Sequence, residues 1–374
     1  VKDNIAPRAE GIILFPQPGK GVVNGKQIHR TFPVNPTQPI TAWGLIGAGI
    51  RAYDHMDGVG NRYGVHTVIL EVDGEEVFRS VVDRFAYEEN RYINSWTHGQ
   101  YMKSFIEPGN RLRMLHASNG NRGLVEINEE RPYRFVYTLS DALGNTSKVR
   151  FTVQGKNTEI HPVEHREKYA FKWDRTNYLQ EPGLELVVPR GMLYDDVWLD
   201  YSVRADSGDV AFTYQLHNKR VPLHGACEMR IGLRRDRLED KSKYYVAGVT
   251  ARGGKYSIGG TYEDGFMKVR IRDLGTYTVA VDTVPPEIIP LNPGQWGRTG
   301  RITLKAKDKE TGINSYRGTI DGKYALFGKP NSISGNLVCE LDPKHVKKGG
   351  RHTVEMTVTD GRGNRTTEEF HFVW

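Results

Sequence analysis

A chain of 374 residues is too long for one ordinary hydrophobic core, so its length predicts about two or three domains. Its 38% hydrophobic and 10% aromatic content is enough for packed cores and excludes a globally disordered chain. No apolar run approaches the ~20 residues that span a bilayer. The net charge of +7 indicates a mild attraction to polyanions such as anionic cell-wall polymers.

Basic residues are dispersed, except in residues 230–237 and 344–351. We find no patch with stacking aromatics and no known nucleic-acid module, so we expect no nucleic-acid partner. Cys227 and Cys339 are the two cysteines, too few for a disulfide scaffold. We expect buried free thiols, with a disulfide between them as the open alternative. Val1 in place of Met predicts a processed or truncated start.

Residues 1–155 alternate apolar and polar side chains with a period of two. Residues 65–72 and 77–82 read as strands on either side of the turn Asp73-Gly74. Residues 134–139 and 148–153 form a second pair around the Asp-x-x-Gly-Asn turn at 141–145. Short strands and frequent turns predict an immunoglobulin-like β-sandwich.

Residues 84–110 interrupt this pattern with an aromatic insertion. We expect a short helix or loop packed against the sandwich. Its aromatic rings are candidates for stacking on sugar rings, with packing in the core as the alternative. The candidate binding residues are Tyr87, Tyr92, Trp96 and Tyr101.

Residues 156–281 are again rich in predicted strands but lack the Asp-x-x-Gly-Asn closure, which predicts a divergent β-sandwich. The Val188-Pro189-Arg190-Gly191 segment, followed by a strand at about 197–203, resembles the β-sandwich module shared by ankyrins and netrin receptors. That resemblance covers only part of the segment.

Residues 282–374 repeat features of the first segment. Asp282-Thr283-Val284-Pro285-Pro286 parallels Asp3-Asn4-Ile5-Ala6-Pro7, and both segments close on Asp-x-x-Gly-Asn. The Asp321-Gly322 turn parallels Asp73-Gly74. Repetition at this scale predicts a second immunoglobulin-like β-sandwich of the same kind. The fold class is therefore all-β, with tandem immunoglobulin-like modules and a divergent middle module.

One motif points to zinc: His161-Pro162-Val163-Glu164-His165 fits the H-x-x-E-H pattern of inverted zinc peptidases. That chemistry needs both histidines on one face of a helix. Pro162 lies within the motif, and we expect an exposed polar junction instead. His161, Glu164 and His165 remain the candidates if the chain is itself a hydrolase.

Aspartates near glycine raise the question of calcium, namely Asp54, Asp57, Asp73 and Asp141. No segment fits an EF-hand loop, and tight turns explain this pairing. A calcium ion at a module junction stays open as an alternative. Gly47-Ala48-Gly49 lies in a predicted strand without a following helix, so we expect no phosphate cradle.

Four further segments resemble a known family. They are Ala52-Tyr53-Asp54-His55-Met56-Asp57-Gly58, Asn61-Arg62-Tyr63-Gly64-Val65, Asp83-Arg84-Phe85 and Arg91-Tyr92-Ile93-Asn94. They resemble the region that follows the catalytic domain in lysostaphin/LytM-type zinc metallopeptidases of Bacteroidetes. The family's zinc-binding H-x-x-x-D and H-x-H patterns do not occur in the sequence, so no catalytic residue can be transferred to this chain.

The resemblance implies a non-catalytic accessory region that positions or regulates a peptidoglycan endopeptidase. It implies export to the cell envelope, periplasmic or outer-membrane-associated. The expected partners are an upstream peptidase domain or a partner envelope protein, and peptidoglycan. We expect no cofactor in this chain and zinc only in the peptidase domain. A stand-alone glycan-binding envelope protein is the first alternative, and a zinc hydrolase is the second.

Overall fold

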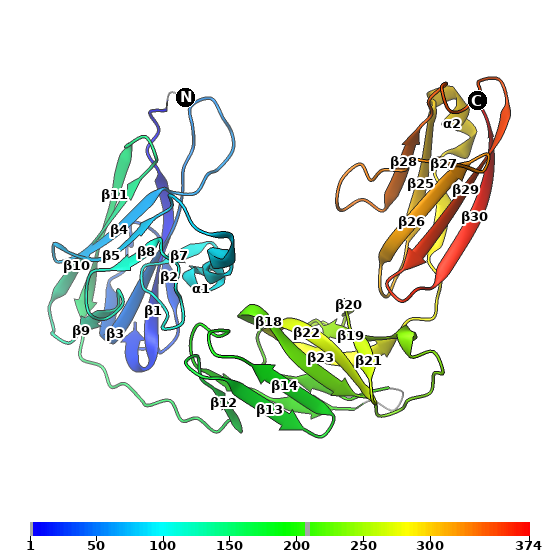
Figure 1. Cartoon of the computed structure of the whole chain (residues 1–374). Coiled ribbons are helices and arrows are strands. Elements are labelled where there is room, and N and C mark those ends of the chain that lie inside the picture. Colours follow the sequence, from blue (N-terminus) through cyan, green and yellow to red (C-terminus); the bar gives the residue numbers. More distant parts are fainter. Residues whose placement is uncertain (1–2, 206–209) are drawn as a thin grey trace. The chain divides into compact units, whose positions relative to one another are not determined.

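The computed structural model describes residues 3–205 and 210–374, and its regular secondary structure is almost entirely β-strand (Figure 1). It confirms the predicted all-β fold of tandem immunoglobulin-like sandwiches with a divergent middle module. The chain forms two compact units. The first comprises Val1–Thr176, Pro189–Trp198 and Pro222–Gly225, and the second comprises Asn177–Val188, Leu199–Val221 and Ala226–Trp374. No helix in the described ranges is long and apolar enough to cross a membrane.

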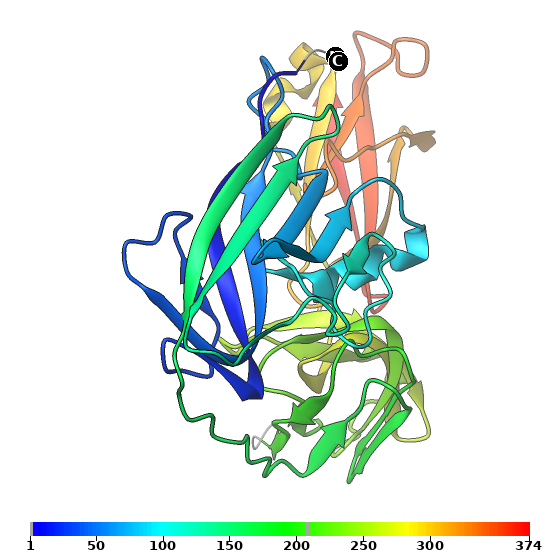
Figure 2. The same cartoon turned by 90° about the vertical axis from the view of Figure 1, so that its left-hand side faces the viewer.

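The first unit is organised by one large sheet in the order β2-β1-β3-β11-β10-β4-β5-β8. The β10–β11 hairpin lies beside β4 (Figures 1 and 2). Strand β11 joins β3 in parallel through Val153 and Ile40. The bounds are β1 (Arg8–Val23), β2 (Arg30–Phe32), β3 (Ile40–Tyr53), β4 (Thr67–Val72), β5 (Glu75–Val81), β8 (Leu115–Ala117), β9 (Val125–Ile127), β10 (Pro132–Ser140) and β11 (Thr146–Gly155).

The alternation of buried and more exposed side chains along its strands explains the core of this sheet. Along β10, Tyr133, Phe135, Tyr137 and Leu139 are buried, because every second side chain of a strand points to the same face. Burial of this row stabilises the fold by roughly 1.5–3 kcal/mol for each large side chain. The hydroxyl of Tyr137 lies 2.8 Å from Ser104 Oγ, so this buried polar group has a partner.

The aromatic insertion contains short helices and strands that pack on the sandwich, as expected. They are η1 (Tyr87–Tyr92), α1 (Ile93–Trp96), β6 (Thr97–His98) and β7 (Tyr101–Lys103). Strand β7 pairs with β3 through Gly49 and Lys103. The insertion is therefore part of the same sheet system.

The middle module contains two five-stranded sheets, β13-β14-β18-β22-β21 and β16-β17-β23-β19-β20. The separate pair β12-β15 falls mostly within the first unit. The bounds are β12 (Tyr169–Phe171), β13 (Asn177–Glu181), β14 (Leu184–Val188), β15 (Val197–Leu199), β16 (Ser202–Arg204), β17 (Thr213–Gln215), β18 (Val221–Gly232), η2 (Lys241–Lys243), β19 (Tyr244–Val249), β20 (Lys255–Gly259), β21 (Thr261–Glu263), β22 (Phe266–Leu274) and β23 (Thr276–Val281). Cys227 and Cys339 are buried and free, as predicted.

The third module has sheets β24-β25-β28 and β27-β26-β29-β30. The bounds are β24 (Glu287–Pro290), η3 (Pro293–Gln295), α2 (Trp296–Thr299), β25 (Arg301–Lys307), β26 (Ile313–Ile320), β27 (Lys323–Ala325), β28 (Asn336–Glu340), β29 (Arg351–Asp360) and β30 (Arg365–Val373). The order β27-β26-β29-β30 matches β5-β4-β10-β11 of the first unit.

The repeat extends to individual hydrogen bonds. Asp73 Oδ1 accepts the backbone N–H of Arg134, and Asp321 Oδ1 accepts that of Thr353. Both aspartates have positive φ, 54° and 50°, and each is followed by a positive-φ glycine. This is the backbone that a two-residue hairpin turn requires. The first and third modules thus share this four-strand order and these turn hydrogen bonds.

Candidate functional site

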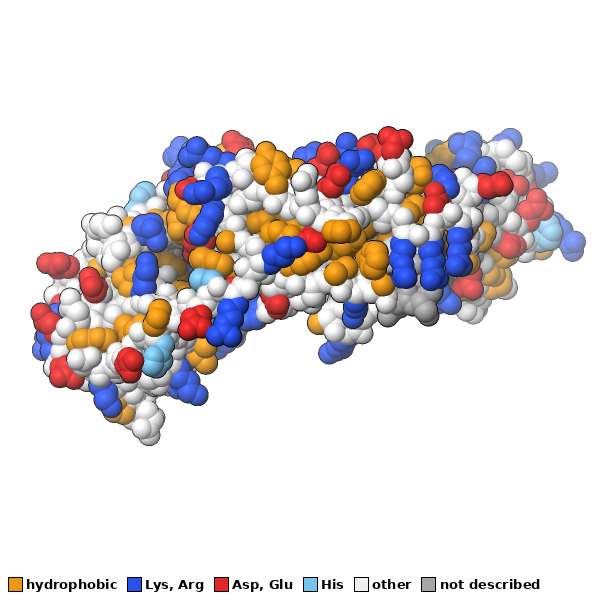
Figure 3. Space-filling model, turned by 90° about the horizontal axis from the view of Figure 1, so that it is seen from below, with side chains coloured by type: hydrophobic (Ala, Val, Ile, Leu, Met, Phe, Trp, Pro, Cys, Tyr) orange, Lys and Arg blue, Asp and Glu red, His pale blue; other side chains and the backbone are white. Residues whose placement is uncertain are grey.

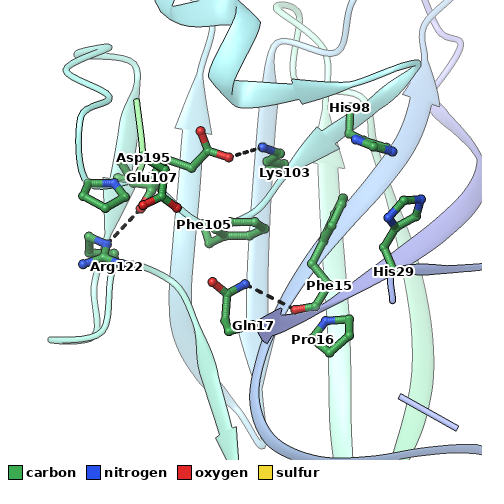
Figure 4. Close-up of a pocket in the computed structure, with 12 residues that line it drawn as sticks. Phe15, Pro16, Gln17, His29, His98, Lys103, Phe105, Glu107, Arg122 and Asp195 are labelled. Atoms are coloured by element: carbon green, nitrogen blue, oxygen red, sulfur yellow. Dashed lines mark hydrogen bonds and ion pairs between the residues drawn. The ribbon is translucent and has the colours of Figure 1, made fainter. Parts of the chain in front are cut away.

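A small pocket lies in the first unit where β1, β6 and β7 meet (Figure 4). Its volume is about 200 Å³. That is below the roughly 300–1,000 Å³ of ordinary small-molecule pockets. It therefore suits one ring of a ligand. Its lining includes Phe15, Gln17, His29, His98, Lys103, Phe105, Glu107 and Arg122.

One wall of this pocket is aromatic. The ring of Phe15 lies edge-on to His98 and to Phe105, each at 5.5 Å between centroids. The rings of His29 and His98 are 4.6 Å apart. Figure 4 shows the two histidines and Phe15 grouped on one side of the pocket. His29 and His98 are exposed, so this wall is accessible from solvent.

A partly buried ion pair supplies the polar side of the pocket. Lys103 is 9% exposed and its ammonium group pairs with Glu107. Ser95 Oγ donates to the second oxygen of Glu107 at 2.7 Å. The ammonium nitrogen also lies 5.6 Å from the Phe105 ring centroid, within cation–π range. The carboxylate is therefore held in one orientation beside the aromatic wall.

The local backbone explains this arrangement. The register of β1 against β3 shifts between Pro16 and Gly21, which bends β1 beside the pocket. A Cβ added to Gly47 of β3 would lie 2.5 Å from the Phe105 ring. Gly47 is thus needed so that the ring can lie against the strand backbone. Gly47-Ala48-Gly49 lies within β3, as predicted, and this close contact explains its first glycine.

The zinc candidates do not assemble. Residues 156–167 form no helix or strand. His161 Nδ1 lies 3.5 Å from Glu159, whereas the His165 ring stacks on Trp198 at 3.7 Å. Glu164 pairs with Arg166 at 2.8 Å. The helical face that H-x-x-E-H requires is absent from this described segment, and an exposed junction is found there instead.

The four predicted sugar-stacking residues lie outside the pocket lining. Trp96 is 6% exposed and its indole N–H donates to Lys103 O at 3.1 Å, so it packs in the core, which was the alternative left open by the sequence. Tyr92 stacks on His224 at 4.0 Å, and Tyr101 is partly buried. Tyr87 is 92% exposed. Sequence reasoning missed Phe15, His29 and His98, which no local motif marks.

A larger cavity of about 590 Å³ lies in the second unit. Arg204, Lys219 and Arg220 contribute cationic side chains to its lining, and Tyr256 contributes a ring. Arg220 pairs with Asp273 at 2.5 Å. On the face shown in Figure 3, basic and acidic side chains are interspersed apart from a short basic row. With Arg220 offset by Asp273, Arg204 and Lys219 give the cavity a modest positive charge.

A family model described as a Zu5-like domain matches residues 168–282. The match covers most of the middle module and contains the Val188-Pro189-Arg190-Gly191 segment. No curated protein matches the chain in sequence.

Several solved structures are distantly similar. The Bacteroides ovatus SGBP-B of a mixed-linkage glucan utilization locus, solved with a mixed-linkage heptasaccharide, is 11% identical with a TM-score of 0.15, covering 86% of this chain and 62% of that chain. A 1.5-MDa bacterial ice-binding adhesin is 9% identical with a TM-score of 0.16, covering 88% and 90%. The human desmocollin-1 ectodomain is 11% identical with a TM-score of 0.19, covering 87% and 64%. The chain thus spans less than two thirds of the first and third structures. At these scores the likeness carries no argument about function.

Proposed function

We propose that this chain is a non-catalytic binding region of the cell envelope that holds a cell-wall glycan in the aromatic pocket. The observation that carries this proposal is the grouping of Phe15, His29 and His98 opposite the fixed carboxylate of Glu107. The apolar face of a sugar ring packs on aromatic side chains. Its hydroxyl groups donate to a carboxylate, whose hydrogen bonds are stronger than neutral ones.

The proposal places the glycan-binding region beside a peptidoglycan metallopeptidase of the lysostaphin/LytM type. The resemblance of residues 52–65 and 83–94 supports this association. In that setting the upstream peptidase domain, or a partner envelope protein, holds the zinc and cleaves the peptide cross-links. This chain retains the wall polymer near it. The proposal also implies an exported protein.

Contacts between the middle and third modules favour a second role, that of a spacer or positioning arm. These contacts form a module joint within the second unit, which consists of Lys243, Tyr244, Tyr245, Glu310 and Arg362. Arg362 Nη1 donates to Tyr244 O at 2.9 Å and to Gly260 O at 3.0 Å, and Tyr245 donates its hydroxyl to Glu310 at 2.7 Å. Such contacts fix the third module against the middle one, as a spacer or positioning arm requires.

Retention on purified sacculi tests glycan binding. The double variant His29→Ala/His98→Ala should bind about tenfold more weakly, because each lost ring contact contributes about 0.5–1.5 kcal/mol. Tyr87→Ala, an exposed aromatic outside the pocket, is the matched control and should bind normally. Retention should change little with salt. Equal retention of the double variant would contradict the proposal, and strong salt sensitivity would move the binding site to the basic cavity of the second unit.

The peptidase association needs its own measurement. We expect the endogenous protein in the cell envelope to carry, or to co-purify with, a zinc peptidase domain. Adding the chain should change the rate at which that peptidase cleaves sacculi. Cleavage of sacculi by the chain alone would contradict a non-catalytic role.

A further inference from the structure

Three aspartates from distant parts of the sequence converge at one end of the first unit. Asp3 precedes β1, Asp54 follows β3, and Asp141 opens the turn between β10 and β11. One carboxylate oxygen from each lies within 4.8 Å of the others. Asp54 and Asp141 are each 6% exposed. In the described ranges 3–205 and 210–374, none of the three forms an ion pair with Lys or Arg.

The hydrogen bonds of these carboxylates differ. Asp141 accepts from the backbone of Leu143 and Asn145 and from the Asn145 side chain, at 2.6–2.8 Å. Asp3 Oδ1 accepts from Ile5 N at 3.1 Å. By contrast, Asp54 Oδ1 is buried and has no hydrogen-bond partner. A buried polar atom without a partner is rare and requires an explanation.

The electrostatic surroundings of Asp54 also disfavour its ionised form. Desolvation by burial raises the pKa of its carboxyl group, and the charges of Asp141 and Asp3 raise it further, whereas the backbone hydrogen bond from His55 and the His55 ring act in the opposite direction without reversing the net rise. Burial and like charges both disfavour the ionised form. A bound cation reverses both effects, because it supplies opposite charge and a ligand for the free oxygen.

A cavity gives access to the cluster. It has a volume of about 240 Å³ and is lined by all three aspartates together with Tyr63 and His66. Two oxygens that bind one Ca²⁺ at about 2.3–2.6 Å lie no more than about 5 Å apart, which the spacing here satisfies. The cavity also has room for the waters that complete a coordination shell of about six to eight oxygens.

We propose that Asp3, Asp54 and Asp141 form a calcium site in the first unit. The ion ties the start of β1 to the end of β3 and to the β10–β11 turn. It therefore closes the sandwich at the end where its first strand enters. This site is separate from the aromatic pocket, and neither depends on the other.

The third module supplies an internal comparison. Asp282, Asp308 and Asp360 are also within 4.8 Å of one another. There, however, Thr311 Oγ1 donates to Asp282 Oδ2 at 2.6 Å and Thr311 N donates to Asp308 Oδ1 at 2.8 Å. Protein groups donate hydrogen bonds to these carboxylates. Among the described residues, none of these three aspartates has a buried side-chain oxygen without a hydrogen-bond partner. The proposal is therefore confined to the first unit.

The test is calcium titration calorimetry and thermal unfolding of the full 374-residue chain after chelator treatment. One site with a Kd of about 10⁻⁴–10⁻³ M is expected, the range of extracellular modules. At ten times the Kd, the transition of the first unit should rise by about 3–6 °C. The same concentration of Mg²⁺ should give a smaller shift, because Mg²⁺ dehydrates reluctantly.

Asp54→Asn should abolish binding yet unfold in chelator at or above the wild-type temperature, because it removes like-charge repulsion. That result separates lost binding from misfolding. Asp3→Asn should weaken binding at least tenfold, whereas Asp308→Asn should leave it unchanged. The proposal is overturned if wild type shows no calcium shift, if Asp54→Asn retains it, if Asp308→Asn alone removes it, or if Mg²⁺ acts equally.

Discussion

At the residue scale, the Lys103–Glu107 pair combines burial with opposite charge. Their side chains are 11% and 21% exposed. Lys103→Met leaves the Glu107 carboxylate partly buried without its cation, so we expect a loss of about 3 kcal/mol in the free energy of unfolding. Urea unfolding measures this value. The double variant Lys103→Met/Glu107→Gln should recover most of the loss, and a single variant as stable as wild type would show that the pair contributes little.

Gly47 makes a second residue-scale prediction. The added Cβ of Gly47→Ala lies 2.5 Å from two carbons of the Phe105 ring, so the ring must move out of its place in the pocket. Overpacking of this kind costs about 1–3 kcal/mol, and sacculus retention should fall with it. Gly64→Ala is the control, since its Cβ meets no atom within 4 Å. It should change stability by less than about 0.5 kcal/mol.

At the element scale, one asparagine ties the closing turn to the segment that leads into the first strand, in the first and in the third module. Asn364 Nδ2 donates to Asp360 Oδ2 at 2.7 Å and to Asp282 O at 3.0 Å, and Asn145 makes the equivalent bonds. Asn364 is 7% exposed, whereas Asn145 is less buried. Asn364→Ala should therefore cost about 2–3 kcal/mol and Asn145→Ala about 1 kcal/mol in chemical unfolding. The reverse order would show that burial does not control the cost.

The β26–β27 turn predicts a pH dependence. A hydrogen bond from His352 at 2.7 Å, followed by one from the Thr353 backbone, lowers the pKa of Asp321 below its ordinary value of 3.8. A lowered carboxyl pKa adds stability that is present above pH 3.8 and is lost as the pH falls through the native-state value.

Compared with wild type, Asp321→Asn should therefore be less stable at neutral pH. It should also lose less stability as the pH falls below 3.8. Asp264→Asn is a matched control, because Asp264 also precedes Gly in a hairpin turn with φ of 48°. Thermal unfolding across pH 2–7 makes the comparison. If Asp321→Asn loses as much thermal stability between neutral and acidic pH as wild type does, then groups other than Asp321 cause the acid sensitivity.

The sequence predicted the β4–β5 and β10–β11 hairpins because their signals are local, but it did not mark long strands such as β1 and β26. The Asp73-Gly74 and Asp321-Gly322 turns are set by residues that tolerate positive φ, and the alternation beside them determines which side chains face the core. The candidate binding residues were harder to predict. Trp96 is aromatic like Tyr87, yet one is buried and the other exposed, and only packing against β7 distinguishes them.

At the scale of the whole molecule, the module joint determines how the second unit behaves. Arg362→Ala removes two charge-assisted hydrogen bonds to backbone carbonyls. We expect a loss of about 2 kcal/mol and a third module that unfolds separately from the middle one. Differential scanning calorimetry should show two transitions in this region. Arg317→Ala, at an exposed arginine over the Tyr324 ring, should leave the profile nearly unchanged; separation of the transitions in both variants would contradict a specific joint.

The sequence by itself determined the all-β class, the hairpins and the repetition of one sandwich in the first and third modules. These depend on periodicity and turn chemistry within a few residues. Only the tertiary structure decided that Asp3, Asp54 and Asp141 meet and that His29 lies beside His98. Neither grouping has a local signal, because each is made by strands that pair across long sequence separations, and burial then decides which polar atoms lack a partner.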